Sequence, residues 1–277
     1  MKIILESGAT KTAWRALYED GTVLRAQTAG LSPTCLDVEQ TRRIVAEAVP
    51  QLNPDGRLVS EVYLYGAGLV GDASAAPLLD VIGTWCPFAR VQFHSDILAA
   101  ARALFGDGSG VVAIMGTGSN SCLYENGVMV RNIRPGGYVL GDEGSGVALG
   151  RAFLSDFVKG MLPQQIEADF ISEYGLDYAQ IVRKVYKEQA ASAFMASLAP
   201  FVLSKASDEY IHEMVKDCLE SFVKRALARY GMPEVGVVGS FGCACRDMLT
   251  EIGERYGLKF VKFLPSPIDE LVRYHGI

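Results

Sequence analysis

A pattern of strand, glycine-containing loop and two-stranded hairpin occurs twice, with a spacing of roughly 106 residues, far above solenoid periods. The first hairpin contains Tyr-Glu-Asp-Gly-Thr-Val-Leu-Arg at 18–25, and the second contains Tyr-Glu-Asn-Gly-Val-Met-Val-Arg at 124–131. Asp-Gly and Asn-Gly favour the tight turns that join antiparallel strands. The repeat therefore predicts two related α/β lobes, each beginning with the same unit. A chance similarity of two hairpins is the alternative.

Small residues fill the loop of each copy, at Glu6–Thr12 and at Gly116–Ser119. Where no Cβ obstructs the approach, the backbone N–H groups of such a loop can surround an anion. Two loops of this kind, facing each other across a cleft between lobes, would form a nucleotide site.

One carboxylate stands out upstream of the second loop. Asp96 follows an expected strand at 91–93, and sites in α/β sheets form at the carboxyl ends of strands. A carboxylate that faces a phosphate-binding loop is what phosphoryl transfer to a hydroxyl needs. The alternative is that Asp96 only caps the helix expected to start at Ile97.

Two further glycine-rich segments stand out. Five glycines lie between 134 and 146, together with Asp142 and Glu143. Such a segment is typical of a functional loop, although these acids could simply favour the N-terminus of the next helix. The loop expected at 239–242, followed by a helix at about 243–257, could pack an adenine ring.

The stretch from 164 to 230 is expected to be helical throughout. Its clearest helix has apolar residues at spacings of three and four from Ile211 to Leu227. Ser207 is the expected N-cap, and Gly231 the expected stop.

Composition excludes several classes of protein. The 277 residues are 49% hydrophobic and 21% charged, with a net charge of −6. These values suit a globular protein and argue against nucleic acid or an anionic membrane as partner. No apolar run reaches the roughly 18 residues of a membrane span. The six cysteines include no CxxC pair, which predicts reduced thiols and a cytoplasmic location.

Taken together, these loops resemble the sugar-kinase, Hsp70 and actin superfamily. They are most similar to the N-acetylglucosamine kinase family and to the BadF/BadG/BcrA/BcrD-type ATPases grouped with it. The motifs that carry the resemblance, in the order of the family, are Glu6–Thr12, Ser95-Asp96, Gly116–Asn120, Gly136–Tyr138 with Gly141–Ser145, and Gly239-Ser240.

The resemblance implies an ATP-dependent kinase that phosphorylates a hydroxyl of an amino sugar. Asp96 would be the general base, and Glu6 and Asp96 would help to place Mg²⁺. The residues implied to bind ATP are Gly8, Ala9, Thr10, Lys11, Thr12, Gly116, Thr117, Gly118, Ser119, Gly239 and Ser240. Those implied to bind the sugar are Ser32, Asn120, Gly137, Tyr138, Asp142 and Glu143.

Departures from the family pattern leave alternatives open. The first acid is Glu6 where the family usually has Asp, Ser7 and Ala9 replace glycines, and Ser32 stands in the loop that usually reads G-x-N-P. A non-catalytic sensor that retains the fold is therefore one alternative. The other is an ATPase that activates a partner enzyme through a cysteine-held iron–sulfur cluster, for which Cys122 is the nearest cysteine.

The expected organisation is two actin-like, ribonuclease H-like lobes with a nucleotide cleft between them. Residues 1–109 would form the first lobe, and 110–266 the second, with a helical insertion. Residues 267–277 would form a helix that packs on the first lobe. A small sugar is the expected partner, and a homodimer is compatible with the sequence.

Overall fold

The computed structural model describes residues 1–8, 10–31, 36–69, 71–188 and 190–276. Ala9 and Ser32, two of the expected ligand-binding residues, lie outside the described residues. The chain divides into two compact units. The first unit combines residues 1–108 with residues 266–277, and the second contains residues 109–265.

The first unit is built on a mixed five-stranded sheet. Its strands lie in the order β3-β2-β1-β4-β5. Strands β1 to β3 form an antiparallel meander, and β4 and β5 continue the sheet parallel to β1. The bounds are β1 Lys2–Ser7, β2 Lys11–Leu17, β3 Val23–Ala29, β4 Glu61–Gly66 and β5 Arg90–Ser95.

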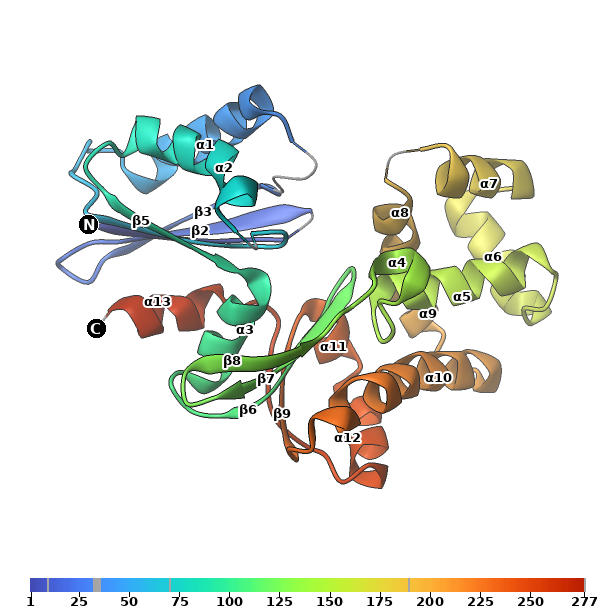
Figure 1. Ribbon diagram of the computed structural model, residues 1–277. Coiled ribbons are helices and arrows are strands. Elements are labelled where there is room, and N and C mark those ends of the chain that lie inside the picture. The colour runs from blue at the N-terminus through green and yellow to red at the C-terminus, as the bar shows by residue number, and fades with distance from the viewer. Residues whose placement is uncertain (9, 32–35, 70, 189, 277) are drawn as a thin grey trace. The chain divides into compact units, whose positions relative to one another are not determined.

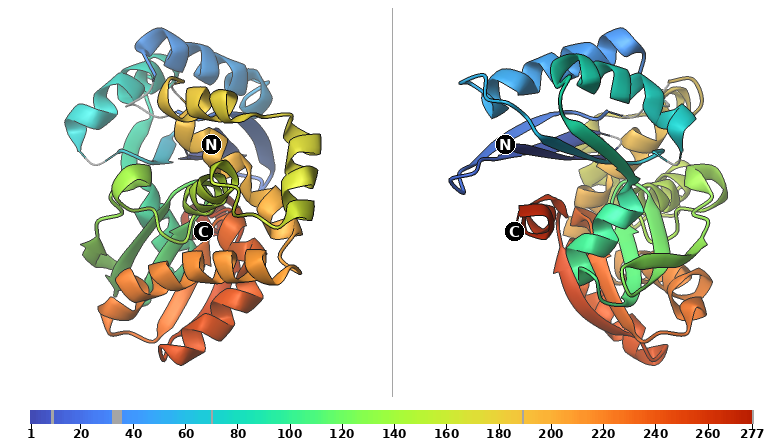
Figure 2. Two further views of the ribbon diagram at one scale, coloured as in Figure 1. Left: turned by 90° about the vertical axis from the view of Figure 1, so that its right-hand side faces the viewer. Right: turned by 60° about the vertical axis from the view of Figure 1, so that its left-hand side comes forward.

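Helices cover both faces of this sheet. Helices α1 (Val38–Leu52) and α2 (Asp72–Trp85) lie on one face, and α13 (Ile268–Gly276) lies on the other (Figure 1 and Figure 2). Alternate residues of β1 separate the two cores, because successive side chains of a strand point to opposite faces. Leu5 belongs to the α1–α2 core, whereas Ile4 packs with residues of α3 (Asp96–Phe105) and α13.

The second unit repeats this sheet. Its strands lie in the order β10-β9-β6-β7-β8, so the meander β6–β8 and the parallel strands β9 and β10 have the topology of the first sheet. The internal repeat predicted from the two hairpins is thereby confirmed. The bounds are β6 Gly110–Met115, β7 Ser119–Glu125, β8 Val128–Ile133, β9 Glu234–Val238 and β10 Lys259–Leu264.

The second unit also contains a group of helices inserted between β8 and β9 (Figure 1). The stretch from 164 to 230 is helical as expected, but in separate segments. Helices of this unit are α4 Gly137–Leu140, α5 Gly146–Val158, α6 Gln164–Tyr174, α7 Tyr178–Tyr186, α8 Ala191–Ser197, α9 Ala199–Ser204, α10 Glu209–Arg225, the 3₁₀ helix Leu227–Tyr230, α11 Ser240–Ala244 and α12 Arg246–Arg255.

Three local expectations are wrong. The N-cap of α10 is Asp208 and not Ser207, because the Asp208 carboxylate accepts from the N–H groups of Tyr210 and Ile211. The loop expected at 239–242 is already helical from Ser240. The segment 134–146 is not loop throughout, since it contains α4.

Close backbone packing holds α5 against α8. A Cβ built on Gly150 of α5 would lie 1.9 Å from the carbonyl oxygen of Met195, so no larger residue fits without a shift of backbone. Gly83 of α2 is also helical, but a Cβ there would meet nothing within 4 Å.

This pair of glycines gives a stability test. Gly150→Ala should lower the free energy of unfolding by about 1–3 kcal/mol through overpacking. Gly83→Ala should raise it by up to about 1 kcal/mol, because alanine favours the helix. Urea denaturation followed by circular dichroism measures both. Equal effects of the two substitutions would contradict the packing argument.

Candidate functional site

Hydroxyl groups hold the first glycine-containing loop. The Ser7 and Thr12 hydroxyls lie 2.9 Å apart, and both accept from the N–H of Leu31, at 2.7 and 3.1 Å. Thr12 is fully buried. Its hydroxyl therefore stabilises the loop, and a role for Thr12 in nucleotide binding stays a prediction. Thr10 and Lys11 are exposed, so a phosphate role for them stays a prediction.

Asp96 is the first residue of α3, immediately after β5. Its carboxylate accepts from the N–H of Ile97 at 2.8 Å. The N-cap of α3, however, is Ser95, whose hydroxyl accepts from the N–H of Leu98. The alternative in which Asp96 serves merely as the helix cap is therefore wrong. Burial raises the pKa of the Asp96 carboxyl, against the opposing effect of the Ile97 hydrogen bond.

Glu6 lies near the end of β1 and shares the electrostatic environment of Asp96. Burial raises the pKa of Glu6 to about 7; the negative charge of Asp96 adds to the rise, and Lys11 opposes it. Two carboxyl groups with raised pKa values at the carboxyl ends of β1 and β5 are typical of acid–base chemistry.

These carboxylates also fit the usual mode of Mg²⁺ binding in kinases. Mg²⁺ is held there by one or two carboxylates, together with substrate phosphates and water. No group of three or more His, Cys, Asp or Glu side chains that could hold a metal by itself occurs among the described residues. Glu6 and Asp96 therefore suit an ion that enters with a nucleotide.

The second loop is fastened to the N-terminus of α5. The N–H groups of Gly146 and Val147 donate to the carbonyl oxygens of Gly116 and Thr117, at 2.9 and 3.0 Å. The N–H groups of Thr117 and Gly118 have no partner among the described residues. They are thus available to an anion. The loop is shorter than expected, because Ser119 already begins β7.

Gly239 packs directly on this second loop. Its φ is +125°, and a Cβ there would lie 2.2 Å from the carbonyl oxygen of Met115. Only glycine permits such an approach together with such a backbone angle. The start of α11, at Ser240, is therefore held next to the loop, as the adenosine interpretation requires.

Asp142 adopts a strained backbone conformation beside the same loop. Its φ is +55°, in the left-handed region that is costly for a residue with a side chain. Its carboxylate accepts from the N–H of Ser119 at 3.4 Å, and a Cβ on Gly118 would lie 2.9 Å from it. Burial raises the pKa of the Asp142 carboxyl. Strain that packing sustains often marks a functional residue.

A cavity of about 330 Å³ brings together part of the expected sugar site. Asn120 and Glu143 line it, together with Ser119. The Asn120 side-chain oxygen accepts from the Ser121 N–H and from the Asn132 amide, both at 2.9 Å, which leaves its amide nitrogen available to a ligand.

Three of the described residues expected to bind the sugar, Gly137, Tyr138 and Asp142, do not line this cavity. Gly137 and Tyr138 belong to α4, and the Tyr138 side chain is exposed. Their place in sugar binding stays a prediction.

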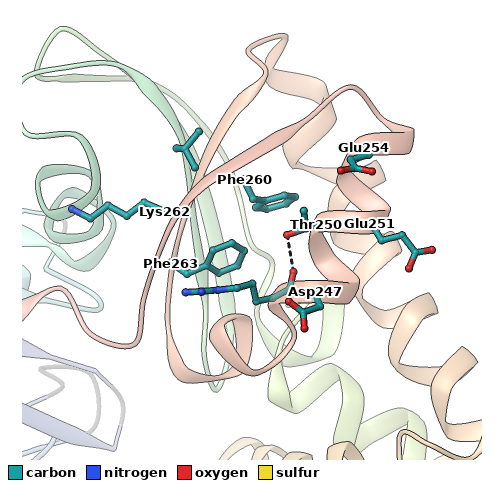
Figure 3. A pocket seen from close by; sticks show the side chains of 9 residues that line it. Asp247, Thr250, Glu251, Glu254, Phe260, Lys262 and Phe263 are labelled. Carbon is teal, nitrogen blue, oxygen red and sulfur yellow. Dashed lines mark hydrogen bonds between the residues drawn. The ribbon is translucent and has the colours of Figure 1, made fainter.

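Other cavities contain residues that the sequence patterns do not single out. A groove of about 510 Å³ lies between α12 and β10, where Phe260 and Phe263 point towards Thr250 and Asp247 (Figure 3). A cavity of about 740 Å³ between α5 and α10 is lined by acids and by Cys218. Surface grooves of this kind have no motif, so no sequence signal predicts them. Only Glu143, in the larger cavity, was expected to bind a ligand.

None of the helices among the described residues combines the length and apolar character needed to cross a membrane.

Solved structures of sugar kinases resemble this chain over nearly its whole length. A candidate N-acetylglucosamine kinase from Porphyromonas gingivalis is 35% identical, with a TM-score of 0.94, over 99% of this chain and 98% of that one. A candidate N-acetylglucosamine kinase from Chromobacterium violaceum is 22% identical, with a TM-score of 0.77, over 99% and 98%.

A ROK family glucokinase from Streptomyces griseus, in complex with glucose and AMPPNP, is 16% identical, with a TM-score of 0.65, over 99% and 98%. Its likeness, and that of the C. violaceum protein, concern the fold alone. No family model and no curated protein matches the sequence.

Two sheets of one topology, each with a glycine-containing loop after its first strand, together with the full-length similarity to the P. gingivalis protein, identify the chain as a sugar kinase of the actin-like ATPase superfamily. Within that class, the identity over the full length shows that the chain belongs to the N-acetylglucosamine kinase-like family.

The raised pKa of Glu6 makes stability depend on pH. Because folded Glu6 keeps its proton up to about pH 7, and the unfolded group only to about its ordinary 4.5, the folded state binds more protons in between. The free energy of unfolding therefore falls as pH rises through this window. In Glu6→Gln that fall is absent, so the variant should be more stable than wild type at pH 8, by about 3 kcal/mol.

Urea denaturation from pH 4.5 to pH 8, without nucleotide or Mg²⁺, measures this difference. Glu47→Gln, at an exposed position of α1, is the matched control and should follow the wild type. A Glu6→Gln curve parallel to that of the wild type would refute the raised pKa.

The backbone strain at Asp142 gives a second prediction. Asp142→Gly relieves the left-handed conformation, and should leave stability unchanged or raise it by about 1 kcal/mol, while sugar phosphorylation falls. Asn126→Gly relieves a φ of +51° in a hairpin turn and should leave phosphorylation intact. Thermal unfolding and ADP release measure both. Full activity of Asp142→Gly would mean that the strain serves no function.

Proposed function

We propose that the protein transfers the γ-phosphate of ATP to a hydroxyl of an N-acetylglucosamine-like amino sugar. The observation that carries the proposal is Asp96. Asp96 follows the carboxyl end of β5, and burial raises the pKa of its carboxyl group. Its negative charge in turn helps to raise the pKa of Glu6. A raised pKa makes a carboxylate a better proton acceptor near neutral pH. The 35% identical P. gingivalis protein, a candidate N-acetylglucosamine kinase, supports the choice of substrate.

In this proposal Asp96 accepts the proton of the sugar hydroxyl as that oxygen attacks the γ-phosphorus. The free N–H groups of Thr117 and Gly118 bind phosphate oxygens, and Gly239 and Ser240 lie against adenosine. Asn120 and Asp142 orient the sugar. Mg²⁺, held with the help of Glu6, would neutralise phosphate charge. Phosphoryl transfer depends mainly on such positioning and neutralisation. That the nucleotide lies between the two lobes stays a prediction.

The partner-activating ATPase receives less support. An iron–sulfur cluster needs thiolate ligands, and an intersubunit cluster needs them at a surface. Cys122 is fully buried, and burial raises the pKa of its thiol to about 12. The sensor alternative predicts ATP binding without turnover, which the following assay detects.

Asp96→Asn tests the catalytic assignment. Loss of the base should lower sugar-dependent ADP release by roughly 10²–10⁴-fold, without loss of folding, since the carboxylate is costly where it is buried. Asp80→Asn, at an exposed position of α2, should retain full activity. The assay measures ADP release with a panel of hexosamines, with and without Mg²⁺.

Full activity of Asp96→Asn would remove Asp96 from the mechanism. If the wild type bound ATP but turned over no sugar in the panel, the sensor alternative would replace the kinase. Sugar-independent turnover by brown, iron-containing protein would favour the activating ATPase.

A further inference from the structure

Three arginines share the cavity that contains Asn120. The cavity measures about 330 Å³ and lies wholly within the second unit. We call it the arginine pocket, and the lining residues that matter here are Asn120, Arg134, Glu143, Arg225 and Arg229. None of the three arginines belongs to the motifs that suggested the sugar site.

The positive charge of the arginine pocket is only partly balanced. Glu143 pairs with Arg225, with 2.7 Å between the carboxylate oxygen and Nε. Arg229 donates to the carbonyl oxygen of Arg225 at 3.1 Å, which is a neutral partner. Arg134 makes no hydrogen bond or ion pair with any residue that the structure describes. Three cations thus face one anion, in a chain whose net charge is −6.

A neutral sugar does not require such a cluster of arginines. Hydroxyl groups are satisfied by amide and carboxylate side chains such as Asn120 and Asp142, whereas guanidinium groups provide paired N–H donors that match carboxylate and phosphate oxygens. Like charges gathered in one small cavity repel each other, and an anion between them would relieve the repulsion.

We propose that the arginine pocket binds an anionic substituent, a carboxylate or a phosphate ester, carried by the amino sugar. The inference rests on the proposed function, because it places the sugar on the amide nitrogen of Asn120. Arg134 lies immediately before a segment whose two ends are joined by a hydrogen bond. The Asp142 N–H donates to the Pro135 carbonyl oxygen at 3.0 Å. The backbone of Arg134 is therefore held beside the cavity, and its side chain is the specificity-determining group.

Four sugars test the proposal: N-acetylglucosamine, a 3-O-carboxyalkyl ether of it, the uncharged 3-O-alkyl ether of equal length, and N-acetylglucosamine 1-phosphate. Steady-state kinetics give kcat/KM for each, and calorimetry gives binding without ATP. We expect kcat/KM for at least one anionic sugar to exceed kcat/KM for the uncharged ether by about tenfold, which is the effect of one charge-assisted hydrogen bond. Preference for the carboxyalkyl ether identifies a carboxylate as the bound group, and preference for N-acetylglucosamine 1-phosphate identifies a phosphate.

Variants assign the preference to Arg134. Arg134→Gln should bring the ratio of kcat/KM for the anionic sugar and the uncharged ether close to one. Arg134→Lys, which keeps the charge but not the paired donors, should retain part of it. Arg183→Gln makes the same change of charge at an exposed position of α7 and should retain the full ratio.

Two results would overturn the inference and leave the kinase in place: phosphorylation of N-acetylglucosamine with no preference for either anionic sugar, or a rise in the KM for ATP, equal for all sugars, in Arg134→Gln. The second would mean that the arginines bind the nucleotide. If no sugar were phosphorylated, but an anionic sugar still bound in an Arg134-dependent way, the proposed function would fail and the anion site would stand.

Discussion

The close approach of Gly239 to Met115 and Gly116 is the contact on which the second unit depends. Parallel pairing of β6 with β9 brings these residues to the same end of the sheet. The absence of a Cβ lets them meet, since such an atom would lie 2.2 Å from the Met115 carbonyl oxygen. With Gly239 in this position, α11 starts beside the second loop. The N-terminus of α5 secures the loop from the other direction through two hydrogen bonds.

In the proposed function, this double attachment would let the loop bind an anion without a charged side chain. The Gly116 and Thr117 carbonyl oxygens are used by α5, so the free groups at the loop are N–H donors. Donors that are fixed before a ligand arrives need no reorganisation when they bind it. The first loop is held differently, since the buried hydroxyls of Ser7 and Thr12 bond to each other and both accept from the N–H of Leu31.

The sequence predicted the parts of the structure that follow from local patterns. The two hairpins revealed the repeat, because their turn residues and alternating apolar residues have few other interpretations. Asp96 was predictable as a residue that follows a strand. The cap of α10 was misplaced by one residue, because Ser207 and Asp208 are both good caps. The segmentation of the helices from 164 to 230 was missed, since apolar spacing continues across short turns.

The charge environment could not be predicted from sequence. Nothing in the motif around Glu6 indicates that burial and Asp96 raise its pKa to about 7. The arginine pocket draws Arg134 from the loop after β8, and Arg225 and Arg229 from the end of α10 and the 3₁₀ helix that follows it. About ninety residues, mostly in the inserted helices, separate Arg134 from Arg225 in the chain, so tertiary packing alone brings the arginines together.

The two copies of the repeat differ at the residue that follows the last strand of each sheet. In the first unit, β5 ends at Ser95 and Asp96 follows, at the start of α3. In the second, the equivalent last strand β10 ends at Leu264 and Pro265 follows. Proline offers neither a carboxylate nor an N–H group. The proposed general base therefore occurs in one copy only, while the other copy contains the loop with free N–H donors and Asn120. With an acid at the end of only one of the two equivalent strands, the proposed kinase has a single position at which an acceptor hydroxyl can give up its proton.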